Sequence, residues 1–311
     1  MIHIENLVKR YGEVLALDHL NLDITEGEIF GLLGPNGSGK TTAINCLLAL
    51  LKYDKGEITV FGEPMHPDSY EQKRQIGIVP QNVAVFEQMS VYENIDYFCG
   101  LYVKEKQKRR ELVEEAIAFV GLEDYRKMLP RKLSGGLLRR LNIACGIAHQ
   151  PRLIILDEPT VAVDPQSRNK ILEGIVALNK KGSTIIYTSH YMEEVEQICT
   201  RIVIMDHGRC IASGTKEELK QMIKTGETIC IEGVMLTDGQ IEAIRALPHV
   251  FQTDYKQEES RLVIKCTSAK HNLIRVLNYL QQEEVPFGRV FSELPTLNDV
   301  FLEITGKELR D

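Results

Sequence analysis

The sequence lacks any apolar run that approaches the roughly 20 residues needed to cross a lipid bilayer. Its first residues, 1–6, also lack the basic region followed by an apolar stretch that marks a secretory leader. The 311 residues are long enough for two globular domains. If the protein works at a membrane, we expect another chain to span it.

Other absences narrow the function further. The seven cysteines include no C-x-x-C pair and lie mostly in apolar segments, which indicates reduced structural thiols rather than a metal site. The formal net charge of -7 argues against a general nucleic-acid binder, so we expect no nucleic-acid partner. No sustained heptad pattern appears, which argues against a long coiled coil.

One glycine-rich stretch lies in the context that a phosphate loop needs. Residues 34–42 read G-P-N-G-S-G-K-T-T, between an apolar run at 28–33 that predicts a buried strand and one at 43–51 that predicts a buried helix. Such glycines let successive N–H groups turn inward, and the following helix presents the positive end of its dipole, so that together they bind polyphosphate. We therefore predict a nucleotide site formed by Gly34, Pro35, Asn36, Gly37, Ser38, Gly39, Lys40, Thr41 and Thr42.

Two acids complete the chemistry that this loop requires. In the G-x-x-x-x-G-K-[ST] pattern, Lys40 reaches the β and γ phosphates and the Thr41 hydroxyl binds Mg²⁺. The run 153–158 is continuously apolar until Asp157 and Glu158, as in a buried parallel strand whose carboxyl end faces a ligand. We predict that Asp157 holds Mg²⁺ through water and that Glu158 reaches the attacking water.

Several weaker features gain meaning only beside this loop. Tyr11, placed in a loop between strands at 2–8 and 17–24, is either an adenine platform or an ordinary surface residue. Gln81 ends a strand predicted at 75–81, and a glutamine at a strand end is normally only a loop residue. Ser134, Gly135 and Gly136 either cap a helix or bind a second anion. Asp164 is an acid in a short loop, and His190 ends a strand predicted at 183–190.

The remaining segments set the domain plan. A capping box at Ser90 opens a helical insertion over about residues 90–150, and residues 201–214 predict a hairpin. Beyond residue 220 the pattern is strand, helix, two strands, helix, strand, which is the ferredoxin-like order. We therefore predict two domains, 1–220 and 221–311.

Taken in order, these residues resemble the nucleotide-binding subunit of ATP-binding-cassette (ABC) transporters over about residues 2–220. The resemblance implies an α/β P-loop NTPase fold, with a RecA-like core, an N-terminal antiparallel β layer and the helical insertion, followed by a small α+β ferredoxin-like domain. It also implies roles for the predicted residues. Tyr11 would be the adenine-stacking aromatic, residues 34–42 the Walker A loop and Gln81 the Q-loop residue. Residues 134–136 would be the signature, 157–158 the Walker B motif with the catalytic glutamate, Asp164 the D-loop residue and His190 the switch histidine.

The resemblance further implies an ATPase with ATP and Mg²⁺ as its cofactors. Glu158 would be the general base, His190 and Lys40 would act on the γ phosphate, and Gln81 would sense metal and water. Two subunits would pack head to tail, as a homodimer or with a paralogous cassette, so that Ser134 and Gly136 of one close over the phosphate held by Lys40 of the other. A separate transmembrane permease would carry the cargo, with this chain on the cytoplasmic, inner face of the membrane.

Two departures and the chain's ending refine the subgroup. Leu137 stands where many members have Gln, and Ala162 and Val163 depart slightly from the common pattern, which bears on dimer affinity and turnover. The run 139–144 and the ending at 294–306 resemble bacterial exporters of drugs, antibiotics and related amphiphiles. The alternatives are an importer subunit with a regulatory C-terminal domain and a soluble cassette ATPase that remodels macromolecules. In the exporter reading, the C-terminal domain would brace the dimer or bind a regulatory ligand.

Overall fold

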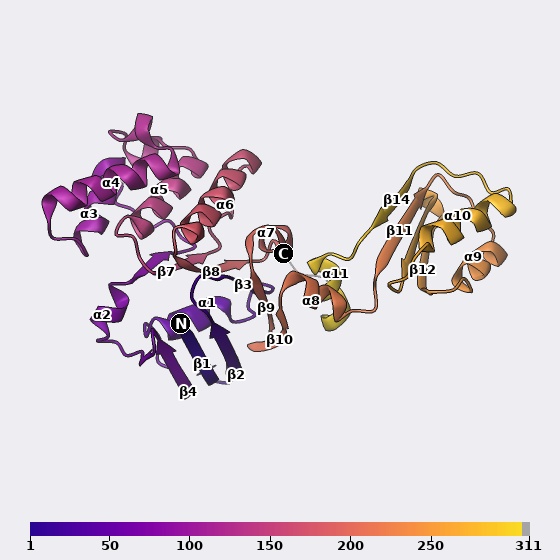
Figure 1. Ribbon diagram of the computed structural model, residues 1–311, viewed down its shortest axis with the longest axis horizontal. Coiled ribbons are helices and arrows are strands. Elements are labelled where there is room, and N and C mark those ends of the chain that lie inside the picture. The colour runs from indigo at the N-terminus through magenta and orange to yellow at the C-terminus, as the bar shows by residue number, and fades with distance from the viewer. Residues whose placement is uncertain (307–311) are drawn as a thin grey trace. The chain divides into compact units, whose positions relative to one another are not determined.

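A computed structural model describes residues 1–306 of the chain. It divides into two compact units, the first over residues 1–215 and the second beginning at Lys216 (Figure 1). The helices are α1 (Lys40–Leu47), α2 (Tyr70–Lys73), α3 (Val91–Gly100), α4 (Lys106–Val120), α5 (Gly135–Ile147), α6 (Pro165–Lys180), α7 (Met192–Ile198), α8 (Lys216–Gln221), α9 (Asp238–Arg245), α10 (Asn272–Gln282) and α11 (Leu297–Thr305).

Three sheets organise the chain, two in the first unit and one in the second. The strands are β1 (Ile2–Tyr11), β2 (Val14–Ile24), β3 (Ile29–Leu33), β4 (Lys55–Val60), β5 (Glu63–Pro64), β6 (Ile76–Val79), β7 (Leu153–Asp157), β8 (Thr184–Ser189), β9 (Arg201–Asp206), β10 (Arg209–Gly214), β11 (Glu227–Glu232), β12 (Val250–Lys256), β13 (Arg261–Cys266) and β14 (Val290–Glu293).

The central sheet of the first unit has the order β10-β9-β3-β8-β7-β6, with β9 to β6 parallel and β10 antiparallel to β9. Every residue of β3, β7 and β8 is buried, because parallel strands are covered on both faces. The carboxyl ends of β3, β7 and β8 therefore meet at one edge, which brings residues after 33, 157 and 189 together.

The N-terminal strands form a separate antiparallel sheet in the order β2-β1-β4-β5. Its apolar face packs with α1 and the central sheet into one core, which includes Ile4, Leu20, Phe30 and Ile155. The predicted P-loop NTPase fold with an N-terminal β layer is confirmed. Tyr11 is the last residue of β1 and pairs with Val14, so its predicted place in a longer loop is wrong.

Helices α3, α4 and α5 pack together beside the central sheet (Figure 1). Ser90 forms the predicted capping box with Glu93 at the start of α3. Two glycines let α5 approach β6: a Cβ on Gly77 would lie 2.3 Å from the Gly146 carbonyl oxygen, and one on Gly146 would lie 2.6 Å from that of Ile78. Any larger residue at either position would push this helix away from the sheet.

In the second unit an antiparallel sheet has the order β12-β13-β11-β14. Its core joins strand residues such as Ile229 and Ile264 to Ile244 of α9 and Val276 of α10. Strand order and helix placement confirm the ferredoxin-like prediction. The seven cysteines are all free thiols, and burial raises the pKa of Cys46, Cys99 and Cys266 to about 11.

Candidate active site

The glycine-rich loop lies between β3 and the first turn of α1, as its sequence predicts. Gly37 has φ +81° and Gly39 has φ +105°, conformations that favour glycine. A Cβ on Gly34 would lie 2.4 Å from the Met205 carbonyl oxygen, so this position also requires glycine. The Ser38 hydroxyl is buried and has no hydrogen-bond partner among the described residues, which leaves a donor for an anion held in the loop.

Lys40 is buried at the centre of this loop. Its ammonium donates to the carbonyl oxygens of Gly34 (2.8 Å) and Pro35 (3.2 Å) and lies 3.8 Å from Glu158 Oε1. Burial lowers the pKa of Lys40, while the charges of Glu158 and Asp157 act in the opposite direction. The lysine thus sits between the loop backbone and the two acids, where a phosphate would add a favourable charge. Of the other loop residues, Pro35 and Thr42 are half-buried and Asn36 is exposed.

Thr41 and Asp157 meet where β7 ends. The Thr41 hydroxyl donates to Asp157 Oδ2 (3.2 Å), and the buried Thr188 hydroxyl donates to Asp157 Oδ1 (2.6 Å). Among the described residues no group of three His, Cys, Asp or Glu side chains forms a metal cluster. Mg²⁺ needs no such cluster, because it is commonly held by one or two carboxylates, substrate phosphates and water. The oxygen donors of Thr41 and Asp157 fit it.

Glu158 lies where the predicted catalytic residues converge. Its Oε2 accepts a hydrogen bond from Gln81 Nε2 (3.1 Å), and its Oε1 lies 3.3 Å from His190 Nδ1. The residue has φ +47°, an uncommon value for a side chain of this size, so the chain leaves the strand sharply after Asp157. Thr188 stabilises this turn, because its hydroxyl accepts from the Glu158 N–H (3.0 Å).

Three residues that sequence reasoning missed hold the segment 80–90 that carries Gln81. Arg139 of α5, itself buried, donates to the Gln81 carbonyl oxygen (2.8 Å), and Asn142 accepts from the Ala84 N–H (3.0 Å). Asn94 of α3 accepts from the Phe86 N–H (2.7 Å). Burial lowers the pKa of Arg139. Polar residues on the inner faces of otherwise apolar helices were the signal that could have identified them.

The predicted signature residues lie in a second group, joined to the start of α6. The Ser134 hydroxyl caps α5 by accepting from the Leu137 N–H (3.3 Å), while Ser134 and Gly135 remain exposed. A Cβ on Gly136 would lie 2.5 Å from Ser167 Oγ and 3.2 Å from Asp164 Oδ2. Asp164 caps α6 by accepting from the Ser167 N–H (2.9 Å), which lowers its pKa. Within residues 1–306, no recorded hydrogen bond or ion pair joins this group to Lys40.

The predicted adenine platform, Tyr11, lies at the end of β1. Tyr11 is half exposed, with Lys9 Nζ 5.1 Å from its ring centroid.

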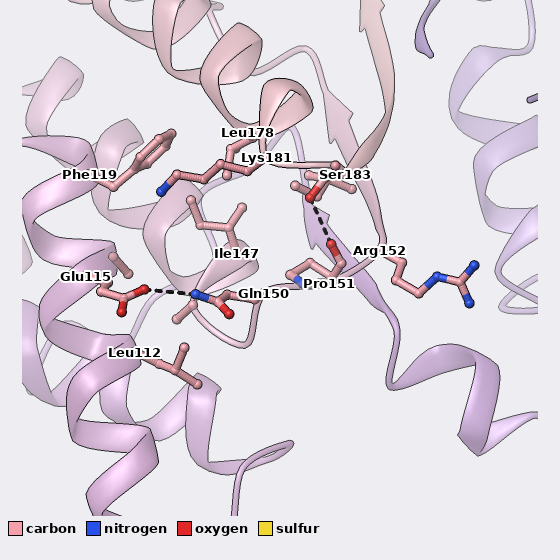
Figure 2. A pocket seen from close by; sticks show the side chains of 14 residues that line it. Leu112, Glu115, Phe119, Ile147, Gln150, Pro151, Arg152, Leu178, Lys181 and Ser183 are labelled. Atoms are coloured by element: carbon pink, nitrogen blue, oxygen red, sulfur yellow. Dashed lines mark hydrogen bonds between the residues drawn. The ribbon is translucent and has the colours of Figure 1, made fainter. Parts of the chain in front are cut away.

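A cavity of about 410 Å³ opens between α4 and the segments that precede β7 and β8 (Figure 2). Leu112, Phe119 and Lys181 help to line it, and none of the predicted site residues does. It lies at the amino ends of β7 and β8, away from the edge that carries Asp157 and Glu158.

Two family models match the chain. The model described as "ABC transporter" matches residues 17–161. The model described as "ATP-binding protein DrrA1-3-like, C-terminal domain" matches residues 214–305. The first match lies within the first structural unit, and the second covers most of the second unit.

Curated relatives match over most or all of their own length. The linearmycin resistance ATP-binding protein LnrL of Bacillus subtilis is 38% identical, with 100% of both chains covered. The daunorubicin resistance ATP-binding protein DrrA3 of Streptomyces coeruleorubidus is 34% identical, over 99% of this chain and 97% of that protein. The Nod factor export ATP-binding protein I of Sinorhizobium fredii is 34% identical, over 100% of this chain and 87% of that protein.

Solved structures resemble the first unit. The dimeric bacterial ABC transporter cassette MJ0796 has a TM-score of 0.64 at 29% identity and covers 69% of this chain and 98% of its own. The same cassette in a dimeric post-hydrolysis state with ADP and Pi matches with a TM-score of 0.64 at 28% identity, over 69% of this chain and 98% of its own.

Proposed function

The chain belongs to the ATP-binding subunits of ABC transporters, in the subgroup with a DrrA-like C-terminal domain, and on that premise we propose how it hydrolyses ATP and what the hydrolysis drives. Members of this family are ATPases that power transport, and the relatives are named for drug resistance and for export. Our proposal is that this subunit powers export of a drug-like or amphiphilic cargo through a separate membrane permease.

One observation carries the catalytic part of the proposal: the Glu158 carboxylate lies within 3.8 Å of Lys40, Gln81 and His190 together. A carboxylate so placed can take the proton of a water that attacks the γ phosphate. The Lys40 ammonium and the loop N–H groups would hold the phosphates, and the His190 imidazole would donate to the γ phosphate. Gln81 would orient the water and the metal.

Thr41 and Asp157 would hold Mg²⁺ through their oxygens, together with Gln81, whose amide donates to Glu158. When bound, the ion neutralises phosphate charge. The chain's own contribution is positioning, because Thr188 fixes both Asp157 and the Glu158 backbone before any substrate arrives. The ATP-binding residues themselves would be those of the loop 34–42 and the Tyr11 platform.

We further propose that the site is completed by a second subunit. Ser134 and Gly135 are exposed and belong to a group separate from Lys40, so they are free to contact a phosphate held by another chain. Asp164 lies against Gly136 and would contact the partner as well. A head-to-tail pair would consist of two copies of this chain or of this chain and a paralogous cassette. The similar cassette MJ0796 is described as dimeric.

The segment that carries Gln81 supports a contact with the permease. Phe86 lies within this segment 80–90, is 41% exposed and packs against Tyr97 (ring centroids 4.9 Å). Exposed clustered aromatics mark interaction surfaces. If a permease segment bound there, a movement of Gln81 would be transmitted to it through the segment 80–90. No described helix is long and apolar enough to span a bilayer, and we propose that the chain works on the cytoplasmic, inner face of the membrane through the permease.

The experiment that tests this function uses the full chain in its native membranes. We expect it to purify, in mild detergent, with a polytopic membrane protein, and the complex to show ATPase activity that candidate amphiphiles stimulate. Recovery without a membrane protein but with ribosomes or assembly factors would instead support the non-transport ATPase. A small molecule that binds residues 221–311 and changes the ATPase rate would favour the importer with a regulatory domain over the dimer brace.

A further inference from the structure

A buried carboxylate on α7 lies outside the site described so far. Glu194 is 3% exposed, and its Oε2 accepts hydrogen bonds from the hydroxyls of Tyr187 (2.6 Å), Thr160 (2.7 Å) and Ser189 (3.2 Å). Its Oε1 lies 3.2 Å from Arg168 Nε, an ion pair without a well-formed hydrogen bond among the described residues. Burying a carboxylate costs several kcal/mol unless paired groups compensate, and an apolar side chain would generally serve stability as well. Stability alone therefore does not explain why Glu194 and its polar partners are buried together.

The partners of Glu194 come from the segments that carry the catalytic residues. Thr160 lies two residues after Glu158, and Ser189 lies directly before His190. Arg168 lies in the first turns of α6, which Asp164 caps. One carboxylate thus joins the loop after β7, the end of β8 and the start of α6.

The loop after β7 needs such an anchor. Glu158 has φ +47° and Ala162 has φ +58°, values at which a non-glycine residue strains the backbone. Such strain persists only where surrounding contacts hold it. Thr188 holds the loop at Glu158, and the hydrogen bond from Thr160 to Glu194 holds it again two residues later.

A second route leads from Glu194 to the histidine. The Arg168 guanidinium lies over the Tyr191 ring, 4.9 Å from its centroid, and that ring lies 4.1 Å from the His190 ring. The Ser189 hydroxyl donates to Glu194 and accepts from the Tyr191 N–H (2.9 Å). The backbone and the ring beside His190 are therefore both fixed through this carboxylate.

We propose that Glu194, with Arg168, is a positioning residue for hydrolysis: it holds Glu158 and His190 in their relative places without touching the nucleotide. This inference rests on the proposed function, because it assigns a task within the same site. A displacement of about 1 Å at a catalytic group can lower turnover by roughly two orders of magnitude. Loss of the Arg168 contact, which leaves the three hydroxyl contacts in place, should therefore cost turnover more than binding.

The test compares Glu194→Gln with Glu193→Gln in the full chain. The amide oxygen can still accept from the three hydroxyls, but the amide nitrogen then faces Arg168, so the variant removes the ion pair and keeps the shape. We expect kcat to fall about tenfold or more while KM for ATP and ATP binding stay within about twofold. Glu193 is exposed on the same helix, and its variant should keep the wild-type kcat.

Arg168→Gln and the double variant separate positioning from general stability. Arg168 has a 29% exposed side chain, so its replacement should leave the fold intact even if Glu194→Gln does not fold. The ion pair is shared by both residues, and Arg168→Gln also removes the contact with the Tyr191 ring. The double variant should therefore lose no more kcat than Arg168→Gln alone, whereas Arg168→Lys should recover part of the rate.

A lowered melting temperature with unchanged kcat per folded protein in Arg168→Gln or Glu194→Gln would overturn the proposal, as would fully additive losses. A wild-type chain without ATPase activity would instead contradict the proposed function.

Discussion

The two units of the molecule differ in what they bury. The first unit buries five charged side chains, Lys40, Arg139, Asp157, Glu158 and Glu194. In the described residues from Lys216 onward the buried polar side chains are Thr225 and Asn272, neither of which carries a charge. Burying a charged side chain costs free energy, and proteins tolerate that cost mainly at functional sites. The buried charges therefore place the catalytic chemistry in the first unit.

The second unit has the features of an ordinary small α+β domain. Its core consists of aliphatic residues of the sheet and of α9 and α10. Two of its helices begin with complete capping boxes, at Thr237 and Thr296. Local propensity and packing thus account for its fold, because the described residues of this unit bury no charged side chain. The comparison predicts that variants in the first unit change the reaction and that variants in the second change stability or assembly.

The largest effect should come from Glu158→Gln. The amide keeps the shape of the side chain but cannot take a proton, so ATP turnover should fall by roughly three orders of magnitude. ATP binding, measured by equilibrium titration, should stay close to that of the wild type. Glu173→Gln, an exposed change on α6, is the control and should leave turnover intact. Normal turnover of Glu158→Gln would remove Glu158 from the role of base.

Matched core truncations test the difference between the units. Ile264→Ala in β13 and Ile155→Ala in β7 each empty a fully buried site. Each should cost about 2–5 kcal/mol of stability in its own unit. Only Ile155→Ala should also reduce ATPase activity per folded protein, because β7 carries Asp157 and Glu158. A loss of catalytic rate in Ile264→Ala would show that the second unit takes part in the chemistry.

The pH dependence of stability should also differ between the units. Burial lowers the pKa of His149 to about 4, and the nearby Ile76 backbone opposes this shift. Within residues 1–306 neither ring nitrogen makes a well-formed hydrogen bond. Below pH 6.5 His149 becomes protonated in the unfolded chain but stays neutral in the folded chain. The free energy of unfolding therefore falls as the pH drops toward 4.

At the acid end of this range the loss should approach about 3 kcal/mol. His149 stacks on Tyr102 (ring centroids 3.8 Å), and His149→Phe should keep that stack and remove this acid sensitivity of the first unit. Unfolding curves measured at several pH values would test this, and an unchanged pH dependence in the variant would contradict the assignment.

The smallest effect should come from Tyr11→Ala. A base stacked on an aromatic ring gains about 1–3 kcal/mol, and Tyr11 is only half exposed at the end of β1, so we expect the low end of that range. KM for ATP should rise several-fold with kcat unchanged. Tyr70→Ala, a more exposed tyrosine of the same unit, should leave both constants unchanged. Equal effects of the two changes would exclude Tyr11 as the adenine platform.

The sequence predicted the elements whose signal is local. The alternating strands of the tail, the capping box at Ser90 and the hairpin at 201–214 all carry their pattern within a few residues, and the structure has them. Asp164 followed by Pro165 was a helix-start signal, but α6 was not predicted from it.

Contacts between distant segments could not be predicted. Nothing near Thr188 indicates that its hydroxyl reaches Asp157, and nothing near Glu194 indicates Thr160, 34 residues earlier. Sequence order indicated which residues would lie close together in the predicted phosphate site, because their strands end at one edge of the sheet. It could not give the residues that hold them, because any polar residue near a strand end fits the same pattern.

The central claim is that the phosphate loop of one subunit works with the exposed Ser134 of another. The most direct measurement mixes two inactive variants, Lys40→Ala and Ser134→Arg, and follows ATP hydrolysis. In a head-to-tail homodimer, half of the pairs in an equal mixture would each contain one intact shared site. The account predicts recovery toward about a quarter of the wild-type rate if the sites act independently. A mixture no more active than its two components would contradict a site shared between two copies of this chain.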